Sequence, residues 1–221
     1  MHESRGALGD RVVDAIRDEI TSGRWPVGLR IPVESELVAW SGAGRNTVRE
    51  AVSSLVQAGM LRREQGRGTF VTARSDLGGA LSRRAAANPR RDTLELRLAL
   101  DTVAARLAAR RRSDAQAEGL LALLEARRTA WCTGDRADRL AADTALHVAI
   151  IIASSNTLLA EVYEGLVAVF ADALDADVSG DEDQFSREHR DLVHAIVAGD
   201  GEAAGAQMHA ILQPLIDALE D

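Results

Sequence analysis

The chain has 221 residues, of which 46% are apolar and 3% are aromatic, so it can form sizeable cores and is not a disordered chain. One cysteine excludes a framework of internal disulfides and fits a reducing cytoplasm; residues 1–10 lack a secretory signal, and no apolar run could span a membrane. The net charge of −8 conceals an asymmetry, because residues 1–74 carry 11 Arg and 9 Asp or Glu, whereas residues 75–221 carry 15 and 25. Charge therefore permits an anionic partner for the first part of the chain without identifying it.

Three helices are predicted before residue 60. Leu8–Ser22 is amphipathic, with apolar residues at helical spacing. Glu34–Trp40 is a short helix, and the turn Ser41–Gly44 separates it from a longer helix at Arg45–Ala58. Two helices joined by a tight glycine-containing turn are typical of the helix-turn-helix, in which Gly42 takes the left-handed conformation.

The third helix has a polar face suited to DNA. Arg45, Asn46 and Arg49 lie near its N-terminal end, which is the part of a recognition helix that reaches base edges in the major groove. The segments at 60–63 and 69–72 are predicted strands, and together they form a hairpin of the kind called a wing. Arg67 at the hairpin tip is expected to enter the adjacent minor groove, although an exposed turn arginine is the alternative when it is considered by itself.

The rest of the chain is helical in its pattern. Residues 75–91 are predicted to be a linker with one helix at Leu77–Ala87, followed by an all-α bundle of about six helices in residues 92–221. The bundle includes predicted helices at Leu158–Leu174 and Gln184–Ala198, and an apolar stripe on its first helix. That stripe consists of Leu96, Leu100, Val103 and Leu107. The fold class is therefore mostly α, with a winged helix-turn-helix (three helices and a small β-hairpin) in residues 1–74.

A few polar residues interrupt the apolar faces of the bundle. Asp143 and His147 are four residues apart and share one side of a helix, and His189 lies on another helix. One Asp and two His from facing helices can make a divalent-metal site with positions open for a ligand. Arg97 and Asp101 form a second pair at the same spacing and are expected to face the same cavity. A structural role for each histidine is the alternative.

Residues 9–72 resemble the GntR family of bacterial regulators. The matching motifs are Ile31-Pro32-x-Glu34-x-Glu36-Leu37, Arg45-Asn46-Thr47-Val48-Arg49-Glu50-Ala51-Val52 and Gly66-x-Gly68-Thr69-Phe70-Val71. The resemblance implies that Arg45 and Arg49 contact bases or phosphates, that Thr47 contacts a phosphate, and that the wing contributes Gly66 and Arg67. Ser35 replaces a DNA-contacting Arg of the family, and Gly44 replaces a Ser or Thr that caps the recognition helix, so a weaker or shifted operator preference is expected.

Residues 92–219 resemble the FCD domain of the FadR subfamily. The matching segments are Glu95-Leu96-Arg97, Asp143-x-x-x-His147, Ser155-Asn156-x-Leu158-Leu159 and Glu188-His189-x-x-Leu192-x-x-Ala195-Ile196-x-x-Gly199-Asp200. The resemblance implies a small carboxylate effector, often bound through a Zn²⁺- or Ni²⁺-type ion held by one Asp and three His.

This chain departs from that ligand set. Ile211 stands where the family has its third His, and His194 and His209 are predicted to face elsewhere. A divalent metal would therefore rest on Asp143, His147 and His189 alone. The alternative is a metal-free pocket in which these residues bind the effector directly, with Arg97 as a carboxylate clamp and Asn156 as a further polar contact.

Together these features predict a cytoplasmic, dimeric transcription regulator of the repressor type. It would bind a pseudo-palindromic operator in double-stranded DNA and respond to an organic acid. One alternative is a bundle that only dimerises and takes no ligand. Another is a metal-dependent enzyme built on the bundle, but the sequence lacks the Glu-x-x-His and His-Glu-x-x-His patterns of such enzymes, so no enzymatic activity is expected.

Overall fold

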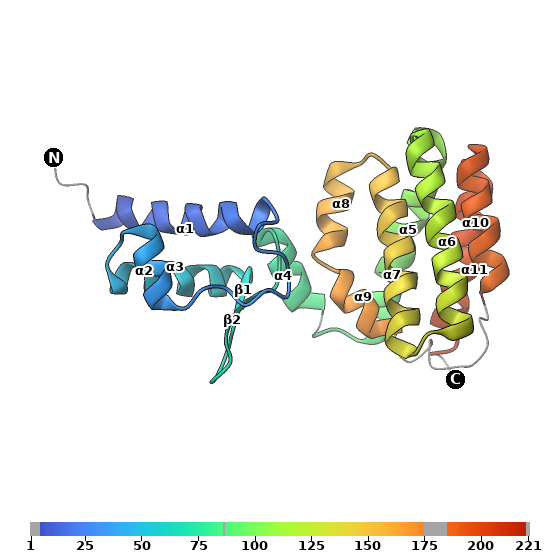
Figure 1. The fold of residues 1–221 in the computed structure, drawn as a ribbon. Helices are drawn as coiled ribbons and strands as arrows, with labels where there is room; N and C mark the ends of the chain where they lie inside the picture. The colour runs from blue at the N-terminus through green and yellow to red at the C-terminus, as the bar shows by residue number, and fades with distance from the viewer. Residues whose placement is uncertain (1–4, 86, 175–184, 220–221) are drawn as a thin grey trace. The chain divides into compact units, whose positions relative to one another are not determined.

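The computed structural model describes residues 5–85, 87–174 and 185–219. These residues form eleven helices and one two-stranded antiparallel sheet (Figure 1), which confirms the predicted fold class. They divide into two compact units, the first ending at Arg84 and the second beginning at Ala85. No helix within the described ranges is long and apolar enough to cross a membrane.

The first unit contains three helices followed by a hairpin and a fourth helix. Its elements are α1 (Arg5–Thr21), α2 (Glu34–Ser41), α3 (Arg45–Ala58), β1 (Leu61–Glu64), β2 (Gly68–Val71) and α4 (Asp76–Ala85). The apolar faces of α1, α2 and α3 meet in one core with the buried ends of the two strands. Gly42 ends α2 with a φ of 68°, as the helix-turn-helix pattern predicts, and this left-handed conformation favours glycine.

The hairpin is anchored on both sides. β1 and β2 pair antiparallel from Leu61–Val71 to Glu64–Gly68. The segment before α2 pairs with the other edge of β2, because the Gly28 amide donates to the Val71 carbonyl and the Val71 amide donates to the Leu29 carbonyl, both at 2.9 Å. The wing is therefore tied to the body of the unit at its base and projects from it at its tip (Figure 1).

Helix α4 lies where the sequence predicts a helix at Leu77–Ala87 within a linker, but it packs against the end of α3. Its Gly79 lies so close to Gly59, the C-cap of α3, that a Cβ added at Gly79 would be 2.6 Å from the Gly59 carbonyl carbon and oxygen. An ion pair of 2.8 Å between Arg17 and Asp76 joins α4 to α1 as well. The two glycines thus allow a backbone-to-backbone contact that a larger residue would exclude.

Replacing Gly79 by alanine is expected to destabilise the first unit, although alanine is the better helix former. The forced separation of the two backbones should lower the free energy of unfolding by roughly 1–3 kcal/mol. Urea denaturation followed by circular dichroism would measure it. Gly119→Ala is the matched control, because nothing lies within 4 Å of its added Cβ, so it should stabilise the protein by up to about 1 kcal/mol. A Gly79→Ala variant as stable as Gly119→Ala would contradict the tight contact.

The second unit is a bundle of helices around α5. Its elements are α5 (Arg90–Arg111), α6 (Asp114–Thr133), α7 (Arg136–Ala153), α8 (Thr157–Glu164), α9 (Val167–Leu174), α10 (Ser186–Ala198) and α11 (Gly201–Asp217). Helix α5 contacts α7, α8, α9, α10 and α11. The predicted helix at Leu158–Leu174 is two helices with a break at Gly165, a weak helix former. The predicted start of a helix at Gln184 lies outside the described residues.

Helix α5 turns an unexpected face towards the bundle. Apart from Leu94, its buried side chains are small or charged, including Ala104, Ala105 and Ala108, and small residues let α11 approach closely. The apolar stripe predicted from the sequence lies on the other side, where Leu96 is 40% exposed and Val103 is 48% exposed. The four residues of that stripe therefore form an apolar ridge on the surface of the unit, hereafter the α5 ridge.

Candidate DNA-binding surface and buried polar cluster

The amphipathic pattern of α3 buries one face and exposes the other. Val48, Val52 and Leu55 lie in the core, while Arg45 and Arg49 are exposed. Asn46 is exposed beside them, and Thr47 is half-buried next to α1. Gly44 at the N-cap offers no side-chain hydrogen bond to the first turn of α3. The backbone amides at this end remain available to an anion, which helix N-termini favour.

A shallow groove continues this surface towards the wing. It is lined by Arg49, Glu50, Ser53, Ser54, Gln57 and Arg63. Arg63 reaches across from β1 and donates to the Ser53 hydroxyl at 3.1 Å. Arg63 was not among the site residues predicted from the sequence, although its place on the strand that follows α3 was a signal for its position beside that helix.

The tip of the wing exposes Gly66 and Arg67. Both Gly66 and Gly68 have positive φ, which the tight turn requires. The Arg67 guanidinium pairs with Glu64 and lies 5.8 Å from the centre of the Phe70 ring. Arg67 is therefore held along the wing while its side chain stays largely exposed.

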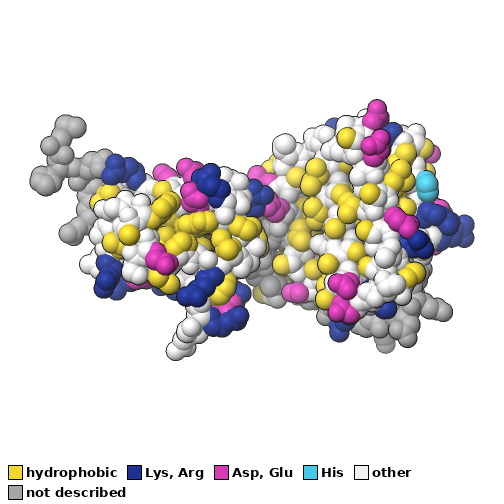
Figure 2. Space-filling view, viewed as in Figure 1, with side chains coloured by type: hydrophobic (Ala, Val, Ile, Leu, Met, Phe, Trp, Pro, Cys, Tyr) yellow, Lys and Arg dark blue, Asp and Glu magenta, His cyan; other side chains and the backbone are white. Residues whose placement is uncertain are grey.

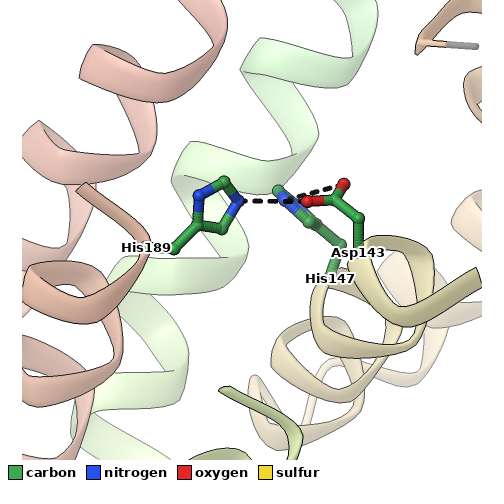
Figure 3. A group of neighbouring side chains, drawn as sticks. All are labelled: Asp143, His147 and His189. Carbon is green, nitrogen blue, oxygen red and sulfur yellow. Dashed lines mark ion pairs between the residues drawn. The ribbon is translucent and has the colours of Figure 1, made fainter. Parts of the chain in front are cut away.

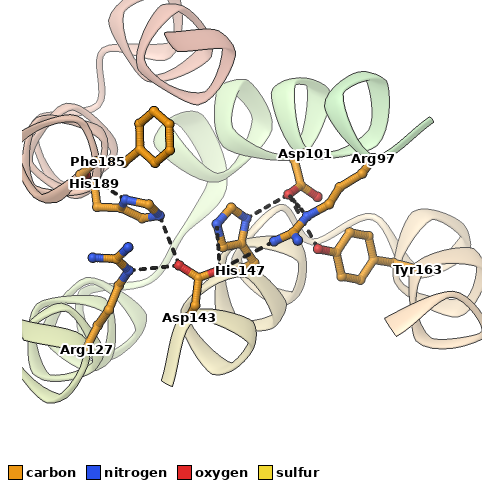
Figure 4. A network of polar contacts seen from close by, with 8 residues as sticks. All are labelled: Arg97, Asp101, Arg127, Asp143, His147, Tyr163, Phe185 and His189. Carbon is orange, nitrogen blue, oxygen red and sulfur yellow. Dashed lines mark hydrogen bonds and ion pairs between the residues drawn. The ribbon is translucent and has the colours of Figure 1, made fainter. Parts of the chain in front are cut away.

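The second unit contains a buried cluster of polar side chains from five helices (Figure 4). Its members are Arg97 and Asp101 on α5, Arg127 on α6, Asp143 and His147 on α7, Tyr163 on α8 and His189 on α10. Each of these seven residues is at most 4% exposed. Such groups stay buried only when they are paired, and this set pairs with itself.

Each histidine has one nitrogen committed to a hydrogen bond. His189 Nδ1 lies 2.7 Å from the Phe185 carbonyl oxygen, which can only accept, so this nitrogen carries the proton. His147 Nδ1 lies 2.7 Å from the Asp101 carboxylate and donates to it. The two Nε2 atoms therefore turn lone pairs towards Asp143 (Figure 3), at 3.3 Å from its Oδ1 for His189 and 3.8 Å from its Oδ2 for His147.

Two guanidinium groups surround the same carboxylate. Arg127 Nε donates to Asp143 Oδ1 at 2.8 Å, and Arg97 Nη2 lies 3.7 Å from Asp143 Oδ2. Arg97 also donates to Asp101 at 3.2 Å. Arg127 stacks on Trp131, with 4.0 Å between its guanidinium carbon and the ring centre. The cluster thus holds two positive and two negative side chains.

The surroundings fix the charge states. Burial alone would raise the pKa of Asp143, but His189, His147 and Arg127 close to its carboxylate hold it well below its usual value. Burial lowers the pKa of His189 against the opposing pull of Asp143, so its imidazole is neutral at pH 7. Burial and the charge of Asp101 raise the pKa of Tyr163, which stays protonated and donates to Asp101.

The donor set fits a divalent metal ion. One ligand atom from each of Asp143, His147 and His189 lies within 4.8 Å of the others. His189 Nε2 is buried and has no hydrogen-bond partner. Its 3.3 Å separation from Asp143 Oδ1 is close to the ~3.4 Å between two tetrahedral ligands that are each ~2.0–2.1 Å from one Zn²⁺ ion. A lone pair that faces a carboxylate oxygen is repelled by it, and a cation bound to both atoms would remove that repulsion.

Four residues of the bundle that were considered from the sequence are not members of this cluster. Asn156 is the N-cap of α8, where its side-chain oxygen accepts from the Leu159 amide at 3.2 Å, and no described contact joins it to the cluster. His194 and His209 are exposed, in agreement with the prediction that they face elsewhere. Ile211 is buried on α11. Asp143, His147, His189, Arg97 and Asp101 are brought together.

Sequence reasoning missed Arg127 and Tyr163. Arg127 follows Leu120 by seven residues and precedes Trp131 by four, so the helical period alone places it on the inward face of α6. An arginine on an inward face needs a buried partner, and this was the available signal. Tyr163 gives no such signal, because a tyrosine on an apolar face is ordinary.

The comparisons with known proteins agree with both parts of the structure. Residues 8–71 match "Bacterial regulatory proteins, gntR family", and residues 92–214 match the FCD domain. The chain is 31% identical, over 93% of its length and 83% of the relative's, to the Escherichia coli (strain K12) protein named "Putative L-lactate dehydrogenase operon regulatory protein". It is 30% identical, over 91% of its length and 84% of the relative's, to the "Probable D-xylose utilization operon transcriptional repressor" of Paenarthrobacter nicotinovorans. The solved structure of Streptococcus agalactiae GntR has a TM-score of 0.58 and 27% identity, and the match covers 95% of this chain and 99% of that chain.

Proposed function

The chain belongs to the GntR family of bacterial transcription regulators and carries an FCD domain behind its DNA-binding unit, and from this premise we propose how it acts. The matching families are regulators of transcription, not enzymes, so the predicted class of function is confirmed. We propose that the protein is a repressor whose affinity for a pseudo-palindromic operator is controlled by an organic acid bound in the second unit. The observation that carries this proposal is the buried polar cluster of the FCD domain.

The DNA contacts are assigned to two elements of the first unit. Arg45, Asn46 and Arg49 would reach base edges or phosphates from α3, and Thr47 would contact a phosphate. The wing would place Gly66 and Arg67 at the minor groove. All of these residues except the half-buried Thr47 are exposed, and this exposure, together with the groove that runs from α3 to β1, supports the assignment.

The effector site is assigned to the buried cluster. Asp143, His147 and His189 would hold a divalent ion of the Zn²⁺ or Ni²⁺ type, which supplies positive charge and open positions for an effector carboxylate. Arg97 would clamp the carboxylate, and Asp101 would hold His147 with its Nε2 towards the ion. A metal-free pocket that binds the acid through Arg97 is the second candidate, because Arg97 already lies beside the three ligands.

Operator binding in the presence of organic acids tests this proposal. The operator would be selected from random DNA with the full chain, and its affinity would be measured by fluorescence anisotropy. An acid that lowers the affinity must bind the DNA-competent and DNA-incompetent states unequally. We expect at least one small hydroxy or dicarboxylic acid to do so, and to do so less well in Arg97→Met. If the acids bind the protein but leave operator affinity unchanged, the second unit does not control DNA binding.

We also propose that the protein is a homodimer joined through the α5 ridge. Apolar side chains reach the surface over much of the face of the second unit turned towards the viewer in Figure 2, so exposed apolar area by itself does not identify an interface. The ridge is distinct because Leu96, Leu100, Val103 and Leu107 follow one another at spacings of four, three and four residues. That spacing makes a continuous seam of the kind that pairs two helices.

Introducing a charge into this ridge is expected to dissociate the dimer. Val103→Glu would bury a carboxylate at the seam, so the dissociation constant should rise at least tenfold, by the cost of an unpaired buried charge. Sedimentation velocity over a range of protein concentrations measures this constant. Leu121→Glu on α6 is the control, since it places the same charge at another exposed apolar position. Equal dissociation constants for the two variants would move the interface away from the α5 ridge.

A further inference from the structure

The charge of the buried cluster is already balanced by the chain itself. Apart from the two histidines, Arg97 and Arg127 contribute two positive charges, and Asp101 and Asp143 contribute two negative charges that lie against them. A divalent ion would add two positive charges to a site closed to water. Buried charge without a counter-charge is costly, so the ion has to compete with the guanidinium groups already present.

The competition is centred on one oxygen atom. Asp143 Oδ1 accepts from Arg127 Nε at 2.8 Å and also faces His189 Nε2 at 3.3 Å. The Asp143 oxygen nearest to His189 is therefore the one that already binds the guanidinium, so an ion between Asp143 and His189 would approach the same atom. The second arginine is differently placed, because Arg97 is 3.7 Å from Oδ2 and donates its shorter bond to Asp101.

Arg127 has a second contact besides Asp143. Its guanidinium stacks on Trp131, which lies four residues further along α6 and is half-buried. A cation held on an aromatic face keeps a favourable contact when its bond to the carboxylate is broken. Arg127 can therefore give up Asp143 without losing every partner.

We propose that Arg127 sets the metal affinity of this site, as an internal cation that a divalent ion has to displace from Asp143. This inference rests on the proposed metal site and adds the residue that weakens it. The displaced guanidinium then lies beside the ion, where it becomes a donor for the carboxylate of an effector. Metal alone is bound weakly, because nothing else compensates the added charge.

Metal titrations of neutral variants test this role. Apo protein would be titrated with Ni²⁺ alone in an isothermal calorimeter, as the wild type, Arg127→Gln and Arg127→Met. We expect both variants to bind Ni²⁺ about tenfold more tightly, or more. Gln keeps a donor for Asp143 and Met does not, so either variant that folds by circular dichroism answers the question.

Two controls separate charge from position. Arg127→Lys keeps the positive charge and should gain little affinity. Arg128→Gln removes an exposed arginine from the next position, where it pairs with Glu125, and should leave the affinity unchanged. If the wild type and the neutral variants bind Ni²⁺ equally, the metal site stands and the role of Arg127 is wrong. If none of them binds Ni²⁺, both the metal site and this inference fail.

Discussion

Replacing Arg49 by alanine is expected to weaken operator binding by about 1–3 kcal/mol for each half-site, the usual cost of losing a bidentate arginine contact. A dimer presents two copies of α3 to a pseudo-palindrome, so the total loss should be twice that of one half-site. The side chain is exposed on the polar face of α3, opposite the buried Val48 and Val52, and its removal should leave the fold intact.

The measurement is fluorescence anisotropy with the selected operator at several salt concentrations. Arg24→Ala is the matched control, because it removes the same charge from the first unit at a residue that binds Glu19 at 2.7 and 3.0 Å. Loss of affinity in Arg49→Ala with little change in Arg24→Ala would identify a local contact. If Arg49→Ala bound the operator like the wild type, α3 would not be the recognition helix.

Replacing Asp143 by alanine is expected to have the largest effect on stability. It leaves Arg127, now paired at 2.8 Å, without its carboxylate in a site closed to water. Breaking a buried ion pair by removing one partner typically costs about 3–5 kcal/mol. The same change removes one of three ligands, so any metal bound by the wild type should be lost.

Urea denaturation and elemental analysis of protein purified without a histidine tag provide the two readings. Asp172→Ala, at an exposed position of α9, is the control and should change neither. The double variant Asp143→Ala/Arg127→Met should recover part of the lost stability, since it removes both charges of the pair. An Asp143→Ala variant that kept wild-type stability would mean that the carboxylate is not a paired anion.

The helices and the hairpin of residues 1–74 were predictable from the sequence to within three residues. Arg45–Ala58 was predicted as a helix and is one with those bounds, because Gly44 and Gly59 flank a segment whose apolar residues follow the helical period. Gly42 was predicted to be left-handed and has a φ of 68°. Short-range chemistry decides these features, and a single sequence carries it in full.

The packing of the second unit was harder to predict from the sequence, because it depends on which face each helix buries. The stripe of Leu96, Leu100, Val103 and Leu107 lies on the outer side of α5, whereas the helix buries its alanines together with Arg97 and Asp101, which were expected to face the cavity. The period of a helix gives its faces but does not say which one a central helix buries when both are partly apolar. Of the partners of Asp143, only Arg127 was missed: the period of α6 places it on an inward face, but nothing in its spacing links it to Asp143 on another helix.

The contact between Gly59 and Gly79 bears on how regulators of this kind can be recombined. A chimera that joins the first unit to another effector domain at residue 74 would lack α4, so the C-terminal end of α3 would lose the helix that packs against it. A junction after residue 85 would keep α4. DNA-binding units joined after residue 85 should keep their operator preference. Units joined at residue 74 should be less stable, whatever effector domain follows them.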